Sequence, residues 1–498
     1  MTIGRRVLLR VGALAAGAAL TSAELTSSAA ASRTKQGPEP AAWQELRRQL
    51  SPAARLYRPG DRDYPLQAAP DNLRYASIAP AGVLACATED DVRVAVRWCA
   101  DHRVPFAPRS GGHNYAGYST TPGLVISLRA MNGVTPEGRR LRLGGGATNS
   151  DVYAARDAGL YFPGGRCPGV GVAGLTLGGG LGFNDRKWGL TCDRLVETRV
   201  VLADGTLVRA ADDENPDLFW ACRGGAGGNF GINTGFVFDA VPVDRLRATV
   251  FDLVFPLTAG QAVIDRIQHI LDTDHNDDVD VRIGFKNAGD GTATLWLLGQ
   301  HLGPEHILRR LLAPLQRLRP TKQFIQERSF WTAQDYLMES PGAQDCYASK
   351  SLVPDRWPTP DTVADIVEWT RTWQPGPTAA TGYVTLFAMG GAGDRPRPDE
   401  TAYPHRAATF VIDIGTHWKP GTPPGQVDDL LAQTGAMHHT LRRRLNTRTA
   451  YVNFPDPDLT GWQHAYYGDN YRRLTEVKRR YDPTGLFHFP QAVGRAPR

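Results

Sequence analysis

Several features that would each indicate a particular class of protein are scarce in this sequence of 498 residues. The six cysteines include no C-x-x-C pair and no cluster with histidine, so the usual metal-binding patterns are absent. Beyond the N-terminus, no run approaches the roughly 18 apolar residues that a transmembrane helix needs. The formal net charge is only +5, from 56 basic and 51 acidic residues without basic runs, so the sequence indicates no nucleic-acid partner.

What remains is the composition of a globular protein with an excess of glycine. Hydrophobic residues make up 42% and charged residues 21%, which excludes a disordered or fibrous chain. The length is about three times that of a typical domain, so we expect at least two lobes. Short apolar runs alternate with amphipathic stretches, which predicts an α+β fold.

The N-terminus has the pattern of an export signal. Arg5 and Arg6 precede a weakly apolar stretch over 11–20, and three alanines at 29–31 offer a cleavage site. We predict a twin-arginine signal over 1–31, secretion of the remainder, and no stable membrane insertion after the signal is removed. A retained anchor is disfavoured because the stretch is too short to span roughly 30 Å of bilayer. Disulfides are possible outside the cell, but the sequence does not select a pairing.

The rest of the chain divides into a lead-in segment (32–70), a first domain (71–245), a second domain (246–445) and a C-terminal segment (446–498). In the first domain, Thr88 or Asp90 is expected to cap a helix. In the second, strand-like and helical runs alternate, which predicts an antiparallel sheet with helices on one face. The predicted helices cover 42–50, 89–102, 259–271, 304–315 and 469–481, and the predicted strands cover 82–87, 103–108, 124–128, 249–255, 279–285 and 292–299.

A first glycine-rich string follows a predicted strand. It reads Pro108-Arg109-Ser110-Gly111-Gly112-His113-Asn114-Tyr115. A Gly-Gly turn exposes consecutive backbone N–H groups, which can bind a pyrophosphate, and His113 lies at the mouth of the turn. The alternative is an ordinary tight turn, with His113 capping a helix or facing solvent.

A second glycine-rich string runs from Gly164 to Gly182 and contains Cys167. Its glycine density lets the backbone approach a flat, charged ligand closely. It lacks the strand and long helix of a Rossmann unit, which disfavours a nicotinamide site. Taken alone, Cys167 is also compatible with a buried small hydrophobic residue or half of a disulfide.

Six further strings complete a family pattern: NPDLFWACRGG (215–225), GNFGI (228–232), YVNFPD (451–456), YGDNY (467–471), YDP (481–483) and FPQ (489–491). With the glycine-rich strings, they make the chain from about residue 75 to residue 491 resemble the berberine bridge enzyme-like flavoprotein oxidases, a branch of the vanillyl-alcohol oxidase superfamily. The resemblance implies a PCMH-type FAD-binding domain over 71–245, a substrate domain over 246–445, and a C-terminal segment that completes the FAD domain.

The resemblance further implies FAD held by two covalent links, from His113 to the 8α methyl group and from Cys167 to C6 of the isoalloxazine ring. Imidazole and thiolate are nucleophiles soft enough for such bonds. Val170 corresponds to a position over the flavin where valine leaves room for dioxygen, which favours an oxidase over a dehydrogenase. The residues implied to contact the cofactor also include Arg109, Ser110, Gly111, Gly112, Asn114, Gly171, Gly174, Gly178, Gly180, Gly182, Gly231, Ile232, Asn453, Tyr467 and Asn470.

The catalytic base is harder to assign, because the tyrosine that many relatives carry fourteen residues after the linking cysteine is replaced by Leu181. The strand-like run 410–418 resembles one from the family's substrate domain that places an acidic or amide side chain over the reactive face of the flavin, and Asp413 lies in this run. Burial among apolar neighbours would raise the pKa of Asp413 toward that of a useful base. The alternative is a structural Asp413 paired with Arg406 or His405.

Tyr451 resembles the tyrosine that orients or deprotonates the substrate in alcohol-oxidising relatives, and Tyr115 is expected on the same face. Both are equally compatible with wall residues at a half-wet surface. The predicted reaction transfers hydride from an alcohol or hemiacetal carbon of a sugar or glycosylated natural product to FAD, and dioxygen then becomes hydrogen peroxide. The alternatives are oxidative cyclisation or dehydrogenation of a polyketide or alkaloid-like scaffold, electron transfer to a partner protein, and a secreted binding protein without turnover. No sequence feature indicates the oligomeric state.

Overall fold

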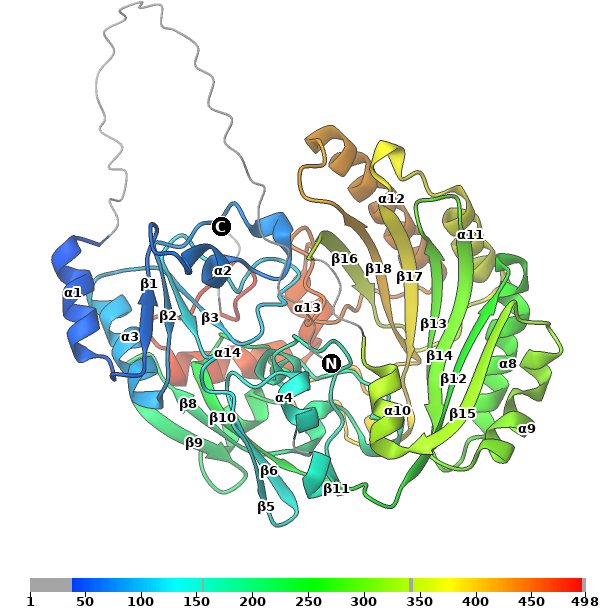
Figure 1. Cartoon of the computed structure of the whole chain (residues 1–498), viewed down its shortest axis with the longest axis horizontal. Helices are drawn as coiled ribbons and strands as arrows, with labels where there is room; N and C mark the ends of the chain where they lie inside the picture. The colour runs from blue at the N-terminus through cyan, green and yellow to red at the C-terminus, as the bar shows by residue number, and fades with distance from the viewer. Residues whose placement is uncertain (1–37, 155, 340–343, 495–498) are drawn as a thin grey trace, which may run out of the picture. The chain divides into compact units, whose positions relative to one another are not determined.

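The two ends of the described chain build one lobe, and the residues between them build another. The structure, a computed structural model, describes residues 38–154, 156–339 and 344–494, so the predicted export signal over 1–31 lies outside the described residues. Figure 1 shows the smaller sheets of the first lobe on the left and the large sheet of the second lobe on the right. The predicted α+β fold, with a C-terminal segment that returns to the first lobe, is confirmed.

The first sheet contains the strand that leads into the first glycine-rich turn. Its order is β1 (Arg55–Tyr57), β2 (Gly82–Ala85), β4 (Leu124–Ser127) and β3 (Phe106–Arg109), and only the edge strand β1 is antiparallel. Helix α3 (Glu89–Asp101) begins with a capping box, in which the Asp91 N–H donates to the Thr88 hydroxyl (3.2 Å) and the Thr88 N–H donates to the Asp91 carboxylate (2.9 Å). Strand β1 and helix α1 (Pro40–Gln49) come from the predicted lead-in, so that segment is an integral part of the lobe.

The second sheet of this lobe is antiparallel and joins segments distant in sequence. Its order is β5 (Val134–Glu137), β6 (Arg140–Gly144), β10 (Ile232–Asp239), β8 (Leu195–Val201) and β9 (Leu207–Ala211). Between β6 and β8, the chain forms α4 (Asn149–Ala154), β7 (Leu160–Tyr161), α5 (Val172–Leu177) and α6 (Asp185–Trp188). Strand β7 pairs with β11 (Val241–Pro242), which follows β10. Buried residues of α7 (Pro216–Ala221), α13 (Trp462–Tyr467) and α14 (Asn470–Tyr481) share one hydrophobic core, which fixes the C-terminal segment to this lobe.

The second lobe is built on an antiparallel sheet, as predicted, and the structure shows seven strands in it. Its order is β15 (Lys322–Ser329), β12 (Arg247–Phe255), β14 (Ala293–His301), β13 (Val279–Asn287), β17 (Thr381–Ala388), β18 (Phe410–Trp418) and β16 (Cys346–Leu352). Helices α8 (Gly260–Thr273), α9 (Glu305–Gln316), α11 (Pro360–Thr372) and α12 (Pro424–Arg444) cover its outer face, and α10 (Phe330–Leu337) lies on the other side (Figure 1).

The alternation of side chains along β18 decides which of its residues face the first lobe. Ile412 and Ile414 are buried in the core beneath the outer helices. Because neighbouring residues of a strand point to opposite faces, Val411 and Asp413 face the other way. Val411 accordingly packs in a cluster with Tyr451 of the C-terminal segment.

The structure also bears on the cysteines and on the surface. All six cysteines lie within the described ranges and all are free thiols, so the possible disulfides do not form.

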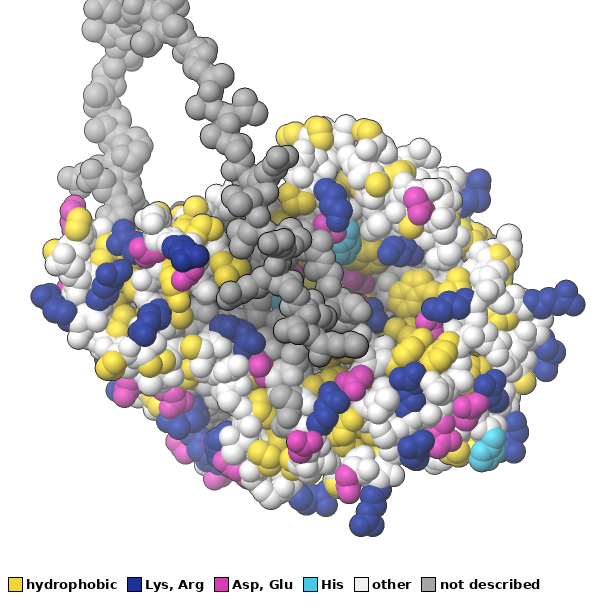
Figure 2. Space-filling model, viewed as in Figure 1, with side chains coloured by type: hydrophobic (Ala, Val, Ile, Leu, Met, Phe, Trp, Pro, Cys, Tyr) yellow, Lys and Arg dark blue, Asp and Glu magenta, His cyan; other side chains and the backbone are white. Residues whose placement is uncertain are grey.

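Among the described helices, none is both long and apolar enough to cross a bilayer. Basic and acidic side chains are interspersed over the face shown in Figure 2, in keeping with the small net charge.

Candidate active site

A cavity of about 680 Å³ is lined by both lobes. The first lobe contributes the glycine-rich turn after β3 and the loop over 165–171, and the second lobe contributes side chains from β13, β16, β17 and β18. The lining includes the predicted catalytic residues Asp413, Tyr451 and Tyr115, and the predicted cofactor-binding residues Arg109, Ser110, Gly111, Gly112, His113, Asn114, Cys167, Val170, Gly171, Gly174, Gly231, Ile232, Asn453 and Tyr467.

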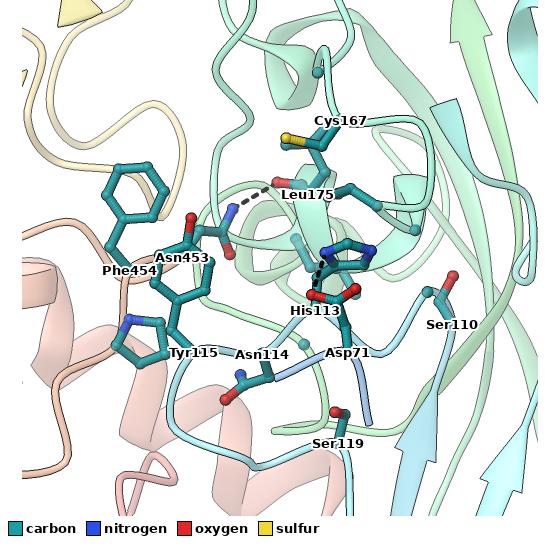
Figure 3. A pocket seen from close by; sticks show the side chains of 18 of the residues that line it. Asp71, Ser110, His113, Asn114, Tyr115, Ser119, Cys167, Leu175, Asn453 and Phe454 are labelled. Atoms are coloured by element: carbon teal, nitrogen blue, oxygen red, sulfur yellow. Dashed lines mark hydrogen bonds and ion pairs between the residues drawn. The ribbon is translucent and has the colours of Figure 1, made fainter. Parts of the chain in front are cut away.

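Two glycines bring the two predicted attachment residues into this cavity. A Cβ atom on Gly111 would lie 2.3 Å from the carbonyl oxygen of Gly169, and one on Gly171 would lie 2.3 Å from the Ser110 hydroxyl. Only glycine therefore allows these two loops to approach so closely. Figure 3 shows the consequence, with the side chains of His113 and Cys167 lining the same pocket.

The turn after β3 presents hydrogen-bond donors that the described protein leaves unused. The backbone N–H groups of residues 110–113 have no acceptor within the described ranges. The hydroxyls of Ser110 and Tyr118 are buried and also lack a partner there. Buried polar groups are nearly always paired, so these donors fit a ligand rich in acceptors. The pyrophosphate and ribityl groups of FAD meet that requirement, and the residues present therefore fit the predicted cofactor.

His113 is held by a carboxylate from the segment before β2. Its Nδ1 lies 3.0 Å from Oδ2 of Asp71, and the Tyr347 hydroxyl donates to the same oxygen (3.0 Å; Figure 3 shows the His113 contact). Burial alone would raise the pKa of Asp71, but the hydrogen bonds from His113 and Tyr347 lower it. The ionised Asp71 therefore fixes the orientation of the imidazole ring.

Cys167 also has a carboxylate partner. Its thiol donates to Oε2 of Glu339 (2.6 Å), and the other oxygen of Glu339 pairs with the guanidinium of Arg166. Burial raises the pKa of the Cys167 thiol, and the charge of Glu339 raises it further. A free Cys167 sulfur is therefore a protonated thiol beside an ionised acid.

Asp413 is buried on the face of the large sheet that looks toward the first lobe. Burial raises its pKa to about 7, although hydrogen bonds from Ser349 and Tyr383 oppose the rise. The Ser349 hydroxyl donates to Oδ1, and the Tyr383 hydroxyl lies 3.4 Å from Oδ2. The alternative of a structural ion pair with Arg406 is wrong, because the Arg406 guanidinium is bound to Asp193 (2.7 Å).

Tyr451 is almost fully buried, and two donors orient its hydroxyl. The oxygen accepts hydrogen bonds from the Gly180 N–H (2.9 Å) and from the Asn453 side-chain amide (3.1 Å). The amide nitrogen of Asn453 also donates to the Leu175 carbonyl (2.9 Å), as Figure 3 shows. Burial raises the pKa of Tyr451, so the phenol keeps its proton at neutral pH.

Aromatic rings form the wall beside these groups. Tyr115 stacks on Phe454, with ring centroids 5.2 Å apart, and meets Tyr347 edge-on at 5.0 Å. Tyr347 in turn stacks on His417 at 5.2 Å. Burial is the main cause of a lowered pKa at His417 and of a raised pKa at Tyr115, so both rings are uncharged at neutral pH. The expected placement of Tyr115 on this face agrees with the structure.

Three glycines that were expected to contact the cofactor lie outside the cavity lining. A Cβ on Gly178 would lie 2.1 Å from Oδ1 of Asn453, and one on Gly182 would lie 2.2 Å from the Gly164 carbonyl. At Gly180, a Cβ would lie 2.3 Å from the Thr191 hydroxyl. These glycines permit close packing of the protein against itself, which their density in the sequence does not distinguish from ligand binding.

Two polar residues also differ from expectation. The side-chain amide of Asn470 lies outside the cavity lining and donates to the carbonyls of Pro398 (2.7 Å) and Thr401 (3.1 Å), so it joins backbone segments. Arg109 lines the cavity, but its guanidinium donates to the carbonyls of Gln67, Ala68, Ala69 and Ser119. The guanidinium of Arg109 therefore binds the protein backbone.

Comparisons with known proteins find FAD-linked oxidoreductases that are similar to this chain. A family model for an FAD binding domain matches residues 80–211, and one described as berberine and berberine like matches residues 450–494. An uncharacterised FAD-linked oxidoreductase of Bacillus subtilis (strain 168) is 32% identical over 427 residues, which cover 83% of this chain and 91% of that protein. The xylooligosaccharide oxidase of Thermothelomyces thermophilus is 30% identical over 448 residues, which cover 85% of this chain and 88% of that protein.

Among solved structures, the xylooligosaccharide oxidase from Myceliophthora thermophila C1 in complex with xylobiose has a TM-score of 0.80 and 28% identity, and the match covers 92% of this chain and 100% of that one. The resemblance seen in the motifs thus extends over most of the chain in both sequence and fold. The chain belongs to the berberine bridge enzyme-like family of FAD-linked oxidoreductases, within the PCMH-type flavoprotein superfamily.

Proposed function

We propose that this chain is an exported oxidase that removes hydride from an alcohol or hemiacetal carbon of a sugar or glycosylated natural product. FAD is attached to both His113 and Cys167 in this proposal, and dioxygen is the final electron acceptor. The observation that carries it is the convergence of His113, Cys167, Asp413 and Tyr451 on one cavity, although they come from distant parts of the chain.

Asp413 is the base in this proposal. With a pKa of about 7, its carboxyl group is substantially ionised at neutral pH and can take the proton of a substrate hydroxyl. Tyr451 has the complementary role. Its oxygen already accepts two hydrogen bonds, and its own proton has no acceptor among the described residues, so it can donate to the substrate oxygen.

The remaining residues position the cofactor. FAD, when bound, supplies the acceptor for the hydride and passes the electrons to dioxygen. His113 and Cys167 would hold its ring system by two bonds, and the unused N–H groups of residues 110–113 would bind its phosphates. Val170 lines the cavity and, in this proposal, leaves the space through which dioxygen reaches the ring.

A sugar substrate is supported by the xylooligosaccharide oxidase of Thermothelomyces thermophilus among the sequence relatives, and by the solved structure of the xylooligosaccharide oxidase from Myceliophthora thermophila C1 in complex with xylobiose. The cavity combines aromatic walls, including Tyr115 and Phe454, with the polar groups of Asp413 and Tyr451. The same aromatic walls would also suit the planar rings of a polyketide or alkaloid-like scaffold, which is the second candidate.

Anaerobic substrate screening tests the proposal. Reducing oligosaccharides such as xylobiose and cellobiose, and a panel of aromatic alcohols, would be mixed with the purified holoenzyme while flavin absorbance is followed. We expect bleaching by reducing sugars, followed on admission of air by one hydrogen peroxide per flavin. Bleaching by polycyclic compounds alone would favour the second candidate, and bleaching without peroxide would favour electron transfer to a partner protein. A flavin that no reductant of either class bleaches would support a binding protein.

A further inference from the structure

The thiol of Cys167 contacts a second carboxylate, which the proposed oxidation does not use. Glu339 follows helix α10 of the second lobe and reaches residues 166 and 167 of the first. Its N–H donates to the Arg166 carbonyl (3.1 Å), its carboxylate pairs with the Arg166 guanidinium, and it accepts the Cys167 thiol hydrogen at 2.6 Å. Backbone and side-chain contacts together therefore hold the carboxylate at the sulfur.

The surrounding charges determine where the proton of this pair resides. Burial alone would raise the pKa of Glu339, but Arg166, the Cys167 hydrogen bond and Arg282 together lower it. Burial and the Glu339 charge both raise the pKa of the thiol. The resting pair is thus a thiol and a carboxylate. Because the thiolate is the nucleophilic form of cysteine, the sulfur needs a base before it can form a new bond.

We propose that Glu339 is this base, and that it accepts the Cys167 proton as the sulfur bonds to C6 of the flavin ring. The inference rests on the proposed attachment of FAD at Cys167. In the balanced reaction, the S–H and C6–H bonds break and one S–C bond forms. The two electrons and two protons that are released reduce one dioxygen to hydrogen peroxide. Glu339 gives up its proton in this balance and is regenerated, while Arg166 holds its carboxylate in place.

The other attachment residue has a base of its own, which makes the inference specific. His113 contacts Asp71 (3.0 Å), and its contact involves neither Glu339 nor Arg166. A change at Glu339 should therefore suppress one link and leave the other. A general loss of FAD binding would suppress both.

Digestion with trypsin places the two attachment residues on different peptides. His113 lies in the peptide over 110–129, and Cys167 lies in the peptide over 167–186. Doubly attached FAD joins these two peptides, so mass spectrometry of the digested full-length holoprotein measures the Cys167 link without any assay of turnover. Glu339→Gln keeps a hydrogen-bond acceptor of the same size but removes the basic carboxylate. The matched control is Asp335→Asn, which removes a carboxylate four residues earlier in the chain, in helix α10, where Asp335 pairs with Arg156.

We expect the wild type and Asp335→Asn to yield the joined peptides. General bases contribute at least about 100-fold, so Glu339→Gln should carry FAD on peptide 110–129 alone after the same expression time. Incubation of that variant at pH 9 in air should then join the peptides, because more of the sulfur is thiolate. A second variant, Glu339→Ala, opens space at the sulfur, and added acetate should restore joining in it.

Equal joining in the wild type and Glu339→Gln would overturn the assignment of Glu339 as the base. Joining that is slow in both Glu339 variants but responds neither to pH nor to acetate would overturn it too, because Glu339 would then act only by holding the loop. A wild type that carries FAD but never joins the peptides would refute the attachment at Cys167 that the proposed function includes. That outcome is distinguishable from failure of this inference, in which the wild type joins the peptides and Glu339→Gln joins them equally well.

Discussion

Replacing Asp413 with asparagine should slow flavin reduction strongly and at the same time stabilise the fold. Burial raises the pKa of Asp413 from 3.8 to about 7. At about 1.36 kcal/mol per pKa unit, this difference corresponds to about 4 kcal/mol between the protonated and ionised forms. The folded chain therefore binds this proton more tightly than the unfolded chain. Its contribution to stability is fully present below about pH 4 and is lost as the pH rises to about 7.

The neutral amide of Asp413→Asn does not titrate, so the variant should escape this loss. We expect its free energy of unfolding to exceed that of the wild type by more at pH 8 than at pH 4, with a difference of up to about 4 kcal/mol. Urea unfolding of the holoproteins at the two pH values measures it. An advantage that is the same at both pH values would show that Asp413 does not titrate with a raised pKa.

The same substitution that stabilises the fold should lower the rate of flavin reduction. An ionised base is required, so the rate of anaerobic flavin reduction in the wild type should rise with pH to a plateau, with an apparent pKa near 7. Asp413→Asn should lower the plateau at least about 100-fold with substrate binding largely intact. Tyr451→Phe should have a smaller effect that appears partly as weaker binding, since its hydroxyl orients the substrate. Stopped-flow absorbance measures both rate and affinity.

Ser349→Ala provides the matched variant, because it leaves the Asp413 carboxylate in place. The Ser349 hydroxyl lowers the pKa of Asp413, so its removal should move the rise in rate to higher pH while the plateau is largely kept. An unmoved profile would show that another group titrates. A mild effect of Asp413→Asn beside a severe effect of Tyr451→Phe, with the loss of an alkaline limb, would assign the base to Tyr451 instead.

Two further predictions concern dioxygen and export. Val170→Leu adds one methylene to the cavity wall and should slow reoxidation of the reduced enzyme by at least about tenfold while substrate reduction changes little, with Val170→Ala as the control that keeps reoxidation fast. Unchanged reoxidation in Val170→Leu would remove this residue as the gate. Replacing Arg5 and Arg6 together by lysine should leave the folded protein inside the cell, as fractionation and immunoblotting would show, and undiminished secretion would exclude the twin-arginine pathway.

The features that were predictable from sequence are those encoded locally. The Gly-Gly turn and the glycines around Cys167 indicate positions where a Cβ atom would prevent a close approach of the backbone. The structure shows such an approach between Gly111 and Gly171. Period-two alternation also places Asp413 correctly, because a residue between two buried isoleucines of a strand must face the opposite side. Both arguments need only a few neighbouring residues.

The partners of these residues were not predictable, because they arise from tertiary contacts. Asp71 contacts His113 from the segment before β2, and Glu339 contacts Cys167 from the other lobe. Neither belongs to a motif, and an isolated acidic residue in a loop is usually solvated. Gly180 shows the converse failure. Its glycine is required by contact with Thr191, and its role in the site comes from the backbone N–H that it donates to Tyr451, which any residue type possesses.

Two of the carboxylates that line the cavity, Asp413 and Glu339, have pKa values shifted in opposite directions. Asp413 is buried with hydroxyl donors only, so its pKa rises to about 7. Glu339 is bound to a guanidinium, so its pKa falls. A group that titrates near neutrality can gain and lose a proton in every turnover. A more acidic carboxylate is a weaker base, which is sufficient for a reaction that each chain needs only once. The proposed division between a base for turnover and a base for cofactor attachment therefore follows from the presence of a guanidinium beside Glu339 and only hydroxyl groups beside Asp413.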